Sequence, residues 1–213
     1  MIRHAALAAA LALAAPFLAT PARAETATLA GGCFWCVEAD FESVAGVGDA
    51  VSGFTGGTTA DPTYGDSGDH IEAVAVPFDE GQVSYRQILD LFFRSIDPTD
   101  AGGQFCDRGQ EYTTAVFVDG PEQRATAEAA KADAEAALGQ PIVTPILDAG
   151  AFYPVGVYHQ DYYKSRDRIA VSSLGIGVPK NEAYLRYRQG CGRDARVRAL
   201  WGEAAPFAGK HGG

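Results

Sequence analysis

Methionine is almost absent from this chain of 213 residues, because its one methionine is Met1. A chain without internal methionine cannot lose its core to methionine oxidation. Positive charge is also scarce, since 17 Lys and Arg stand against 27 Asp and Glu and give a net charge of −10. This acidity argues against nucleic acid or an anionic membrane surface as a partner.

Long apolar runs are equally scarce. Only the run over residues 5–18 is long, and it is too short to span a bilayer comfortably. It follows basic residues and precedes Ala22-Arg23-Ala24, which puts small residues at the positions that a signal peptidase reads. We therefore expect residues 1–24 to be a signal peptide, cleaved after Ala24, and the protein to be periplasmic or secreted. Residues 25–213 are expected to form one catalytic domain.

There are four cysteines, Cys33, Cys36, Cys106 and Cys191. In an exported chain they are compatible with two structural disulfides. A disulfide between Cys33 and Cys36 would close too short a loop to constrain the unfolded chain, however, so a redox role fits their spacing better. A zinc site is disfavoured because Cys106 and Cys191 each stand alone.

Hydrophobic spacing and turn residues predict an alternation of strands and helices. The expected strands cover residues 27–30, 46–54, 71–76 (ended by Pro77), 113–118 and 142–147. The expected helices cover 37–44, 85–94, 121–138, 181–188 and 194–200, with loops over 55–69 and 97–110. This order predicts an α+β fold, a ferredoxin-like two-layer sandwich with a split β-α-β core. The chain from Ala151 onward is expected to be an irregular C-terminal wrap around the site.

The segment Gly31 to Cys36, Gly-Gly-Cys-Phe-Trp-Cys, carries the strongest chemical signal. It reads as a strand, a tight glycine turn and a helix that begins near Cys33. A cysteine at a helix N-terminus is expected to have a lowered pKa and to be partly thiolate. Phe34 and Trp35 add an apolar surface, which indicates a nucleophile acting on a small apolar group. A buried structural cysteine is the alternative.

Glu72 is the candidate acid. On a strand it shares a face with Val74 and Val76, so burial is expected to raise its pKa and to keep it protonated near neutral pH. The alternative is a glutamate on an edge strand that points to water.

Further candidates lie in the two loops and in the tail. Asp107 and Tyr112 precede a strand, where loops often carry functional groups, although this signal is weak. His159 lies in an aromatic segment and is better interpreted as a satisfied histidine than as a base. Glycines on both sides of Cys191 indicate a mobile, exposed cysteine.

These segments together resemble methionine sulfoxide reductase A, the reductase of the S epimer. The matching motifs are Gly32-Cys33-Phe34-Trp35, Gly53-Phe54-Thr55-Gly56-Gly57, Pro62-Thr63-Tyr64, His70-Ile71-Glu72-Ala73-Val74, Asp97-Pro98-Thr99, Asp107-Arg108-Gly109 with Tyr112, Phe152-Tyr153-Pro154 and Tyr158-His159-Gln160-Asp161-Tyr162. The resemblance implies that Cys33 attacks the sulfoxide sulfur. It implies that Glu72, Tyr112 and Tyr162 bind and protonate the oxygen.

The same resemblance implies the other parts of the site. Asp107 supports it, Phe34 and Trp35 hold the substrate methyl group, and Phe54 lines the substrate site without the hydroxyl of the family's usual tyrosine. No metal or organic cofactor is implied. The substrate is methionine sulfoxide in proteins or peptides, the reductant is thioredoxin-like, and a monomer is expected.

Attack is expected to leave a sulfenic acid on Cys33 that a second thiol resolves to a disulfide. The family's Gly-Tyr-Cys tail is absent here, so two candidates remain, Cys191 on the tail and Cys36 one helical turn away. We favour Cys191, with Cys36 second, and we consider a separate bond between Cys36 and Cys106. Two rivals to the reductase are a thioredoxin-like Cys-x-x-Cys disulfide oxidoreductase and a disulfide-stapled binding module.

Overall fold

The computed structural model describes residues 24–172 and 175–211. Apart from Ala24, the expected signal peptide lies outside these residues. The strands are β1 (Ala24–Gly31), β2 (Val51–Thr55), β3 (Ile71–Asp79), β4 (Gly103–Gln104), β5 (Asp107–Arg108), β6 (Thr114–Val118), β7 (Ile146–Asp148), β8 (Tyr153–Pro154), β9 (Val171–Ser172) and β10 (Gly175–Ile176). The helices are α1 (Phe34–Glu42), α2 (Tyr85–Phe93), α3 (Gly120–Leu138), α4 (Lys180–Gly190) and α5 (Arg193–Trp201), with short 3₁₀ turns η1 (Gln110–Tyr112) and η2 (Gly202–Ala204).

A six-stranded mixed sheet forms the centre of the molecule, with strand order β7-β6-β1-β3-β2-β8. The central strand β1 pairs antiparallel with both β3 and β6, and β7 runs parallel to β6 after the crossover through α3. The fold is therefore mixed α+β, as the sequence predicts. Because β1 pairs with a strand on each side, the turn that follows it and carries Cys33 leaves the sheet from an interior strand.

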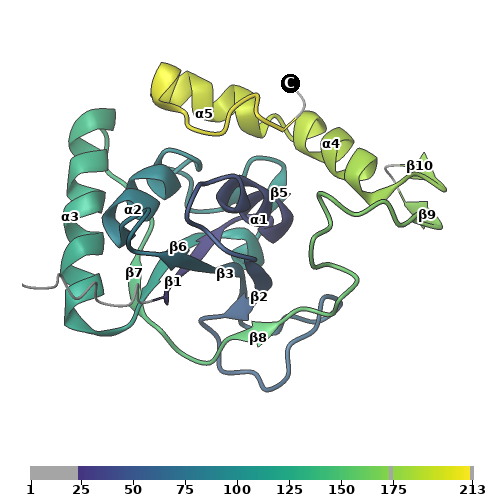
Figure 1. Ribbon diagram of the computed structural model, residues 1–213, viewed down its shortest axis with the longest axis horizontal. Helices are drawn as coiled ribbons and strands as arrows, with labels where there is room; N and C mark the ends of the chain where they lie inside the picture. The colour runs from purple at the N-terminus through teal and green to yellow at the C-terminus, as the bar shows by residue number, and fades with distance from the viewer. Residues whose placement is uncertain (1–23, 173–174, 212–213) are drawn as a thin grey trace, which may run out of the picture.

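Helices α1, α2 and α3 cover one face of this sheet (Figure 1). The core between them is one apolar cluster, to which β1 contributes Leu29, α1 contributes Phe41 and α2 contributes Phe92, each fully buried. A smaller cluster covers the opposite face, where Phe152 of a long loop packs against Phe117 and its neighbours. Ser84 is the N-cap residue of α2 and forms a capping box with Gln87, which fixes where the helix starts.

Several predicted strand boundaries are wrong, and β1 begins at Ala24 where the sequence predicts a start at residue 27. Strand β3 continues past Pro77 to Asp79. The Pro77 carbonyl accepts the Gly48 amide, which lies outside β2, and an N–H at position 77 would point to the same side. The proline therefore removes no hydrogen bond between paired strands, and the strand is not ended there. Strand β2 begins only at Val51, and the predicted strand over 142–147 is shortened to β7. The residues before β7 bond elsewhere, since the Val143 amide donates to Pro98 and Lys131 donates to the Thr144 carbonyl.

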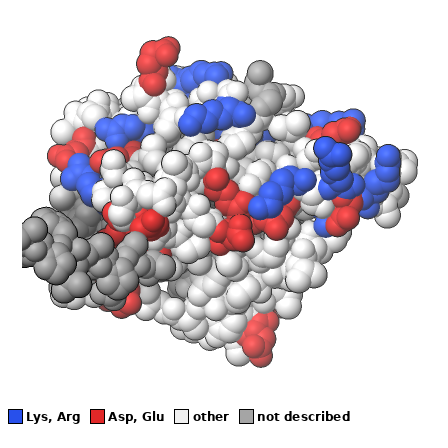
Figure 2. Space-filling view, viewed as in Figure 1, with Lys and Arg blue, Asp and Glu red and all other residues white. Residues whose placement is uncertain are grey.

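Helices α4 and α5 form the C-terminal wrap and lie along one edge of the molecule (Figure 1). Figure 2 shows Lys and Arg side chains gathered along that edge. Several of these cations pair with acidic groups of the body, as Arg196 does with Asp97 at 2.6 Å. No helix among residues 24–172 and 175–211 is long and apolar enough to cross a membrane.

Candidate active site

Cys33 occupies the turn between β1 and α1. Gly32 before it has φ of +78°, and a Cβ at Gly32 would lie 2.5 Å from the Cβ of Gln104, so glycine is required there. Cys33 is the N-cap residue of α1, and its carbonyl accepts the amide of Val37 at 3.3 Å. The structure thus confirms the predicted strand, glycine turn and helix, with the cysteine at the helix N-terminus.

A small pocket of about 50 Å³ opens at this turn. Its lining consists of Cys33, Phe34, Trp35, Tyr64, Glu72, Asp107, Tyr112 and Tyr187. Six of these eight are residues that the sequence singled out as site candidates. The pocket is too small for a large ligand, so it suits the end of one side chain. A hollow of about 490 Å³ lies elsewhere, between residues 46–48 and 77–82, and none of the cysteines lines it.

Glu72 lies on β3, with only 2% of its surface exposed. Its Oε2 accepts the backbone amide of Phe34, the first residue of α1, at 2.8 Å. Burial raises the pKa of Glu72 well above its usual value, against the opposing effect of that hydrogen bond, and the nearby Glu111 and Asp107 carboxyls add to the rise. The predicted direction of the Glu72 pKa is correct, and the rise favours the protonated acid at the helix N-terminus.

The predicted lowering of the Cys33 pKa is wrong. Cys33 is 5% exposed, and this burial raises the pKa of its thiol, as do a hydrogen bond to Cys36 and the nearby Glu72 carboxyl. Burial of the thiol, the largest of these causes, outweighs what a helix N-terminus offers an anion. The same hydrogen bond lowers the pKa of Cys36, and although burial opposes this, the Arg193 guanidinium favours the Cys36 thiolate. The contact between the two sulfurs therefore raises the pKa of Cys33 and lowers that of Cys36.

Aromatic rings wall the pocket on the side of Trp35. Tyr162 stacks on Trp35 with ring centres 3.9 Å apart, so it supports the indole and is not among the residues that line the pocket. His159 stacks on Tyr64 at 3.8 Å, and burial lowers its pKa to about 4, so its imidazole is neutral. The prediction that His159 belongs to an aromatic cover agrees with these contacts, but the expectation of a satisfied histidine is wrong, because its buried Nδ1 has no hydrogen-bond partner among the described residues. Phe54 is fully buried behind Phe34, with ring centres 5.9 Å apart.

Asp107 and Tyr112 reach the pocket from the segment before β6. Burial raises the pKa of the Asp107 carboxyl, while a hydrogen bond from the Tyr187 hydroxyl opposes the rise. Burial also raises the pKa of Tyr112, so its phenol stays a donor. Sequence reasoning missed Tyr187, which comes from α4. Tyr64 appeared only within a motif, and no local pattern marked Tyr187.

The Cys106 and Cys191 sulfurs form a disulfide across 85 positions of sequence, while Cys33 and Cys36 are free. The expectation that Cys191 is mobile and exposed is wrong, because it is half-buried at the end of α4 and covalently held. The separate bond considered between Cys36 and Cys106 is also wrong. The signal that pairs Cys106 with Cys191 is tertiary, since neither cysteine has a partner near in sequence.

Comparison with known proteins agrees with this geometry. The family model described as peptide methionine sulfoxide reductase matches residues 25–188. Peptide methionine sulfoxide reductase MsrA 2 of Rhizobium meliloti is 48% identical over 198 residues, which cover 91% of this chain and 92% of that protein. Its counterpart of the same name in Caulobacter vibrioides is 44% identical over 207 residues, covering 95% and 97%.

Solved structures give the same answer for the fold. Mxr1 of Saccharomyces cerevisiae in its reduced form has a TM-score of 0.62 at 27% identity, covering 67% of this chain and 86% of that one. Methionine sulfoxide reductase A of Corynebacterium diphtheriae has a TM-score of 0.58 at 29% identity, covering 75% and 84%. The chain belongs to the peptide methionine sulfoxide reductase family.

Proposed function

We propose that this enzyme reduces the S epimer of methionine sulfoxide, in proteins and peptides, with Cys33 as nucleophile and Glu72 as acid. The reaction class, thiol-dependent reduction of methionine sulfoxide, follows from the family. The observation that carries the assignment of roles is that Cys33 and the buried Glu72 line one pocket of about 50 Å³.

The reaction needs an acid because the sulfoxide oxygen leaves sulfur poorly until it is protonated. Glu72 donates a proton to that oxygen while the Cys33 sulfur attacks the substrate sulfur. The hydroxyl then moves from the substrate sulfur to the Cys33 sulfur as the S–O bond and the new S–S bond both break. Methionine leaves with the electron pair of the S–S bond, and Cys33 is left as a sulfenic acid. The proton of the Cys33 thiol replaces the one that Glu72 gave. Tyr112 supplies a hydroxyl donor from the pocket wall, and Tyr162 acts through the position of Trp35.

The second half of the cycle removes the sulfenic acid. Condensation with a second thiol forms a disulfide and releases water. The hydrogen bond between Cys33 and Cys36 favours Cys36 for this role, and Cys191 remains the alternative. An external dithiol, which we propose to be a thioredoxin-like protein, then reduces the disulfide by exchange.

We further propose an exported, monomeric enzyme, in which residues 1–24 are removed and residues 25–213 form the catalytic domain. The support for export is the sequence pattern of residues 1–24. We also propose that the core is ferredoxin-like. The order β6-β1-β3-β2, with α1 between β1 and β2 and α2 between β3 and β6, supports a split β-α-β arrangement.

The decisive experiment offers separate R and S epimers of a methionine sulfoxide peptide to the enzyme with dithiothreitol. We expect turnover of the S epimer alone, and its loss in Cys33→Ser. A thioredoxin-like oxidoreductase, the rival reading, needs only its cysteines. It would therefore reduce insulin disulfides equally well with Glu72→Gln and leave both epimers untouched, which would contradict the proposal.

A further inference from the structure

Tyr187 of α4 lines the pocket although it lies far along the chain from the motif residues. Its hydroxyl donates a hydrogen bond to Oδ2 of Asp107, and its ring meets Trp35 edge-on, with centres 6.0 Å apart. Burial raises the pKa of Tyr187, so the phenol keeps its proton and remains a donor. Part of the pocket lining thus comes from the C-terminal wrap, and a hydrogen bond joins it to the body there.

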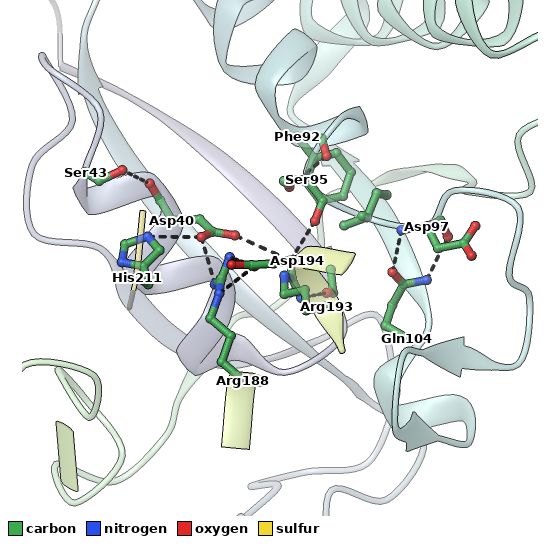
Figure 3. Close-up of polar contacts among 12 residues, drawn as sticks. Asp40, Ser43, Phe92, Ser95, Asp97, Gln104, Arg188, Arg193, Asp194 and His211 are labelled. Atoms are coloured by element: carbon green, nitrogen blue, oxygen red, sulfur yellow. Dashed lines mark hydrogen bonds and ion pairs between the residues drawn. The ribbon is translucent and has the colours of Figure 1, made fainter. Parts of the chain in front are cut away.

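The end of α4 is anchored independently of that bond. Arg188 of α4 and Arg193 of α5 are both 2% exposed and both pair with Asp40, which is buried on α1, at 2.9 Å and 3.6 Å (Figure 3). Arg188 also pairs with Asp194 at 2.8 Å. These buried contacts fix α4 to α1, so Tyr187 is presented from a rigid element.

The Cys106–Cys191 disulfide joins the same two segments as the Tyr187 hydrogen bond. Cys106 directly precedes Asp107, and Cys191 lies one helical turn after Tyr187, with its amide donating to the Tyr187 carbonyl at 2.9 Å. One link is covalent and the other is a hydrogen bond, and they lie side by side. The disulfide therefore holds the backbone of Asp107 within reach of the Tyr187 hydroxyl.

From these contacts we propose that Tyr187 is a positioning residue for sulfoxide reduction, and that the Cys106–Cys191 disulfide keeps it in place. Together they hold the Asp107 carboxyl in the pocket beside Cys33 and Glu72. This inference rests on the proposed function. In this scheme Tyr187 and the disulfide act through Asp107, and neither takes part in the bond changes at the reacting atoms.

The chemistry explains why Asp107 must be held ionised. Protonation of the sulfoxide oxygen places positive charge on the substrate sulfur, which a carboxylate in the same pocket stabilises. The groups that face Asp107 are Cys33 from the β1–α1 turn, Glu72 from β3, Tyr112 from η1, Tyr187 from α4 and Arg193 from α5. Of these, only Tyr187 and Arg193 favour its charged form. Loss of the Tyr187 hydroxyl thus raises the pKa of Asp107.

The test is the pH profile of single-turnover methionine release, measured without added thiol on the S epimer of a methionine sulfoxide peptide. Single turnover needs no resolving cysteine. Tyr187→Phe keeps the ring against Trp35 and removes the hydroxyl alone. We expect the acid limb of its profile to move to higher pH by about one unit, with a plateau roughly tenfold lower, as loss of one hydrogen bond to a charged group gives.

The matched control is Tyr163→Phe, which removes a hydroxyl bonded to Glu42 at 2.6 Å, outside the pocket. Its profile should equal that of the wild type. The double variant Cys106→Ser/Cys191→Ser should show the same shift of the acid limb as Tyr187→Phe, and adding Tyr187→Phe to it should shift the limb no further. Peptide mapping of the unreduced wild type confirms the disulfide before the assay.

The outcomes separate the two claims. Turnover that depends on Cys33, with an acid limb unmoved in Tyr187→Phe, overturns this inference and leaves the proposed function intact. A uniform loss of rate at every pH also overturns it, because that is what a merely structural role produces. Failure of the wild type to reduce the S epimer contradicts the proposed function itself, and this inference with it.

Discussion

The guanidinium of Arg193 donates a hydrogen bond to the backbone carbonyl of Gly31 across 3.2 Å, and a second to the Ser95 carbonyl across 3.0 Å. Gly31 ends β1, two positions before Cys33. A residue of α5 therefore supports the active-site turn through its backbone, and the same side chain pairs with the buried Asp40 (Figure 3).

Replacing this arginine should destabilise the fold strongly. Arg193→Met removes one buried ion-pair partner of Asp40 and the hydrogen bonds that Arg193 donates to two backbone carbonyls. We therefore expect a loss of about 3–5 kcal/mol in the free energy of unfolding. The measurement is urea unfolding followed by circular dichroism. Arg86→Met is the matched control, since Arg86 pairs with Asp133 at the surface, where such a pair contributes less than about 1 kcal/mol. Equal losses in the two variants would contradict the role of Arg193.

Glu72→Gln should abolish most of the activity while it preserves the fold. The amide oxygen can still accept the Phe34 amide, but the amide donates no proton to the sulfoxide oxygen. We expect a rate of methionine formation about 100- to 10,000-fold lower, the range for loss of a general acid. Circular dichroism should show an unchanged fold. A variant within a few-fold of the wild-type rate would remove Glu72 from the mechanism.

Glu38 should make the stability of the protein depend on pH. Burial raises the pKa of Glu38 from 4.5 to about 7, although the Asp161 amide and the Ser52 hydroxyl donate to its carboxyl. The folded state therefore favours the protonated form. This stabilisation is complete below pH 4.5 and is lost as the pH rises to about 7, by up to about 3 kcal/mol.

The variant that checks this dependence is Glu38→Gln, which is neutral at every pH. Urea midpoints at several pH values between 4.5 and 8 should fall with pH in the wild type and should fall less steeply in the variant. Parallel curves for the two proteins would show that Glu38 does not titrate in this window.

The resolving cysteine can be identified by trapping the sulfenic acid of Cys33. If Cys36 resolves it, Cys36→Ser treated with one equivalent of sulfoxide substrate should accumulate the sulfenic acid, which dimedone traps and mass spectrometry detects. Cys191→Ser should not accumulate it, because Cys36 remains hydrogen-bonded to Cys33. The converse pattern would restore Cys191 to the role that the sequence alone favours.

Local sequence determined the parts of the protein that depend on near neighbours. The glycine turn before Cys33, the helices and the strand face of Glu72 follow from residue spacing and backbone preference, so their positions were predictable. The pKa direction of Glu72 was predictable for the same reason, since alternation along β3 places it among apolar side chains. The family motifs named the pocket residues that lie before residue 163.

Only the tertiary structure decided which distant segments meet. The bond between Cys106 and Cys191, the contact of Tyr187 with Asp107 and the burial of Arg193 join parts of the chain separated by 80 or more positions. No local pattern records such pairings, because they depend on how α4 and α5 pack against α1. The raised pKa of Cys33 has the same origin, since burial and the carboxyls gathered from β3 and β5 outweigh the helix N-terminus that the sequence shows.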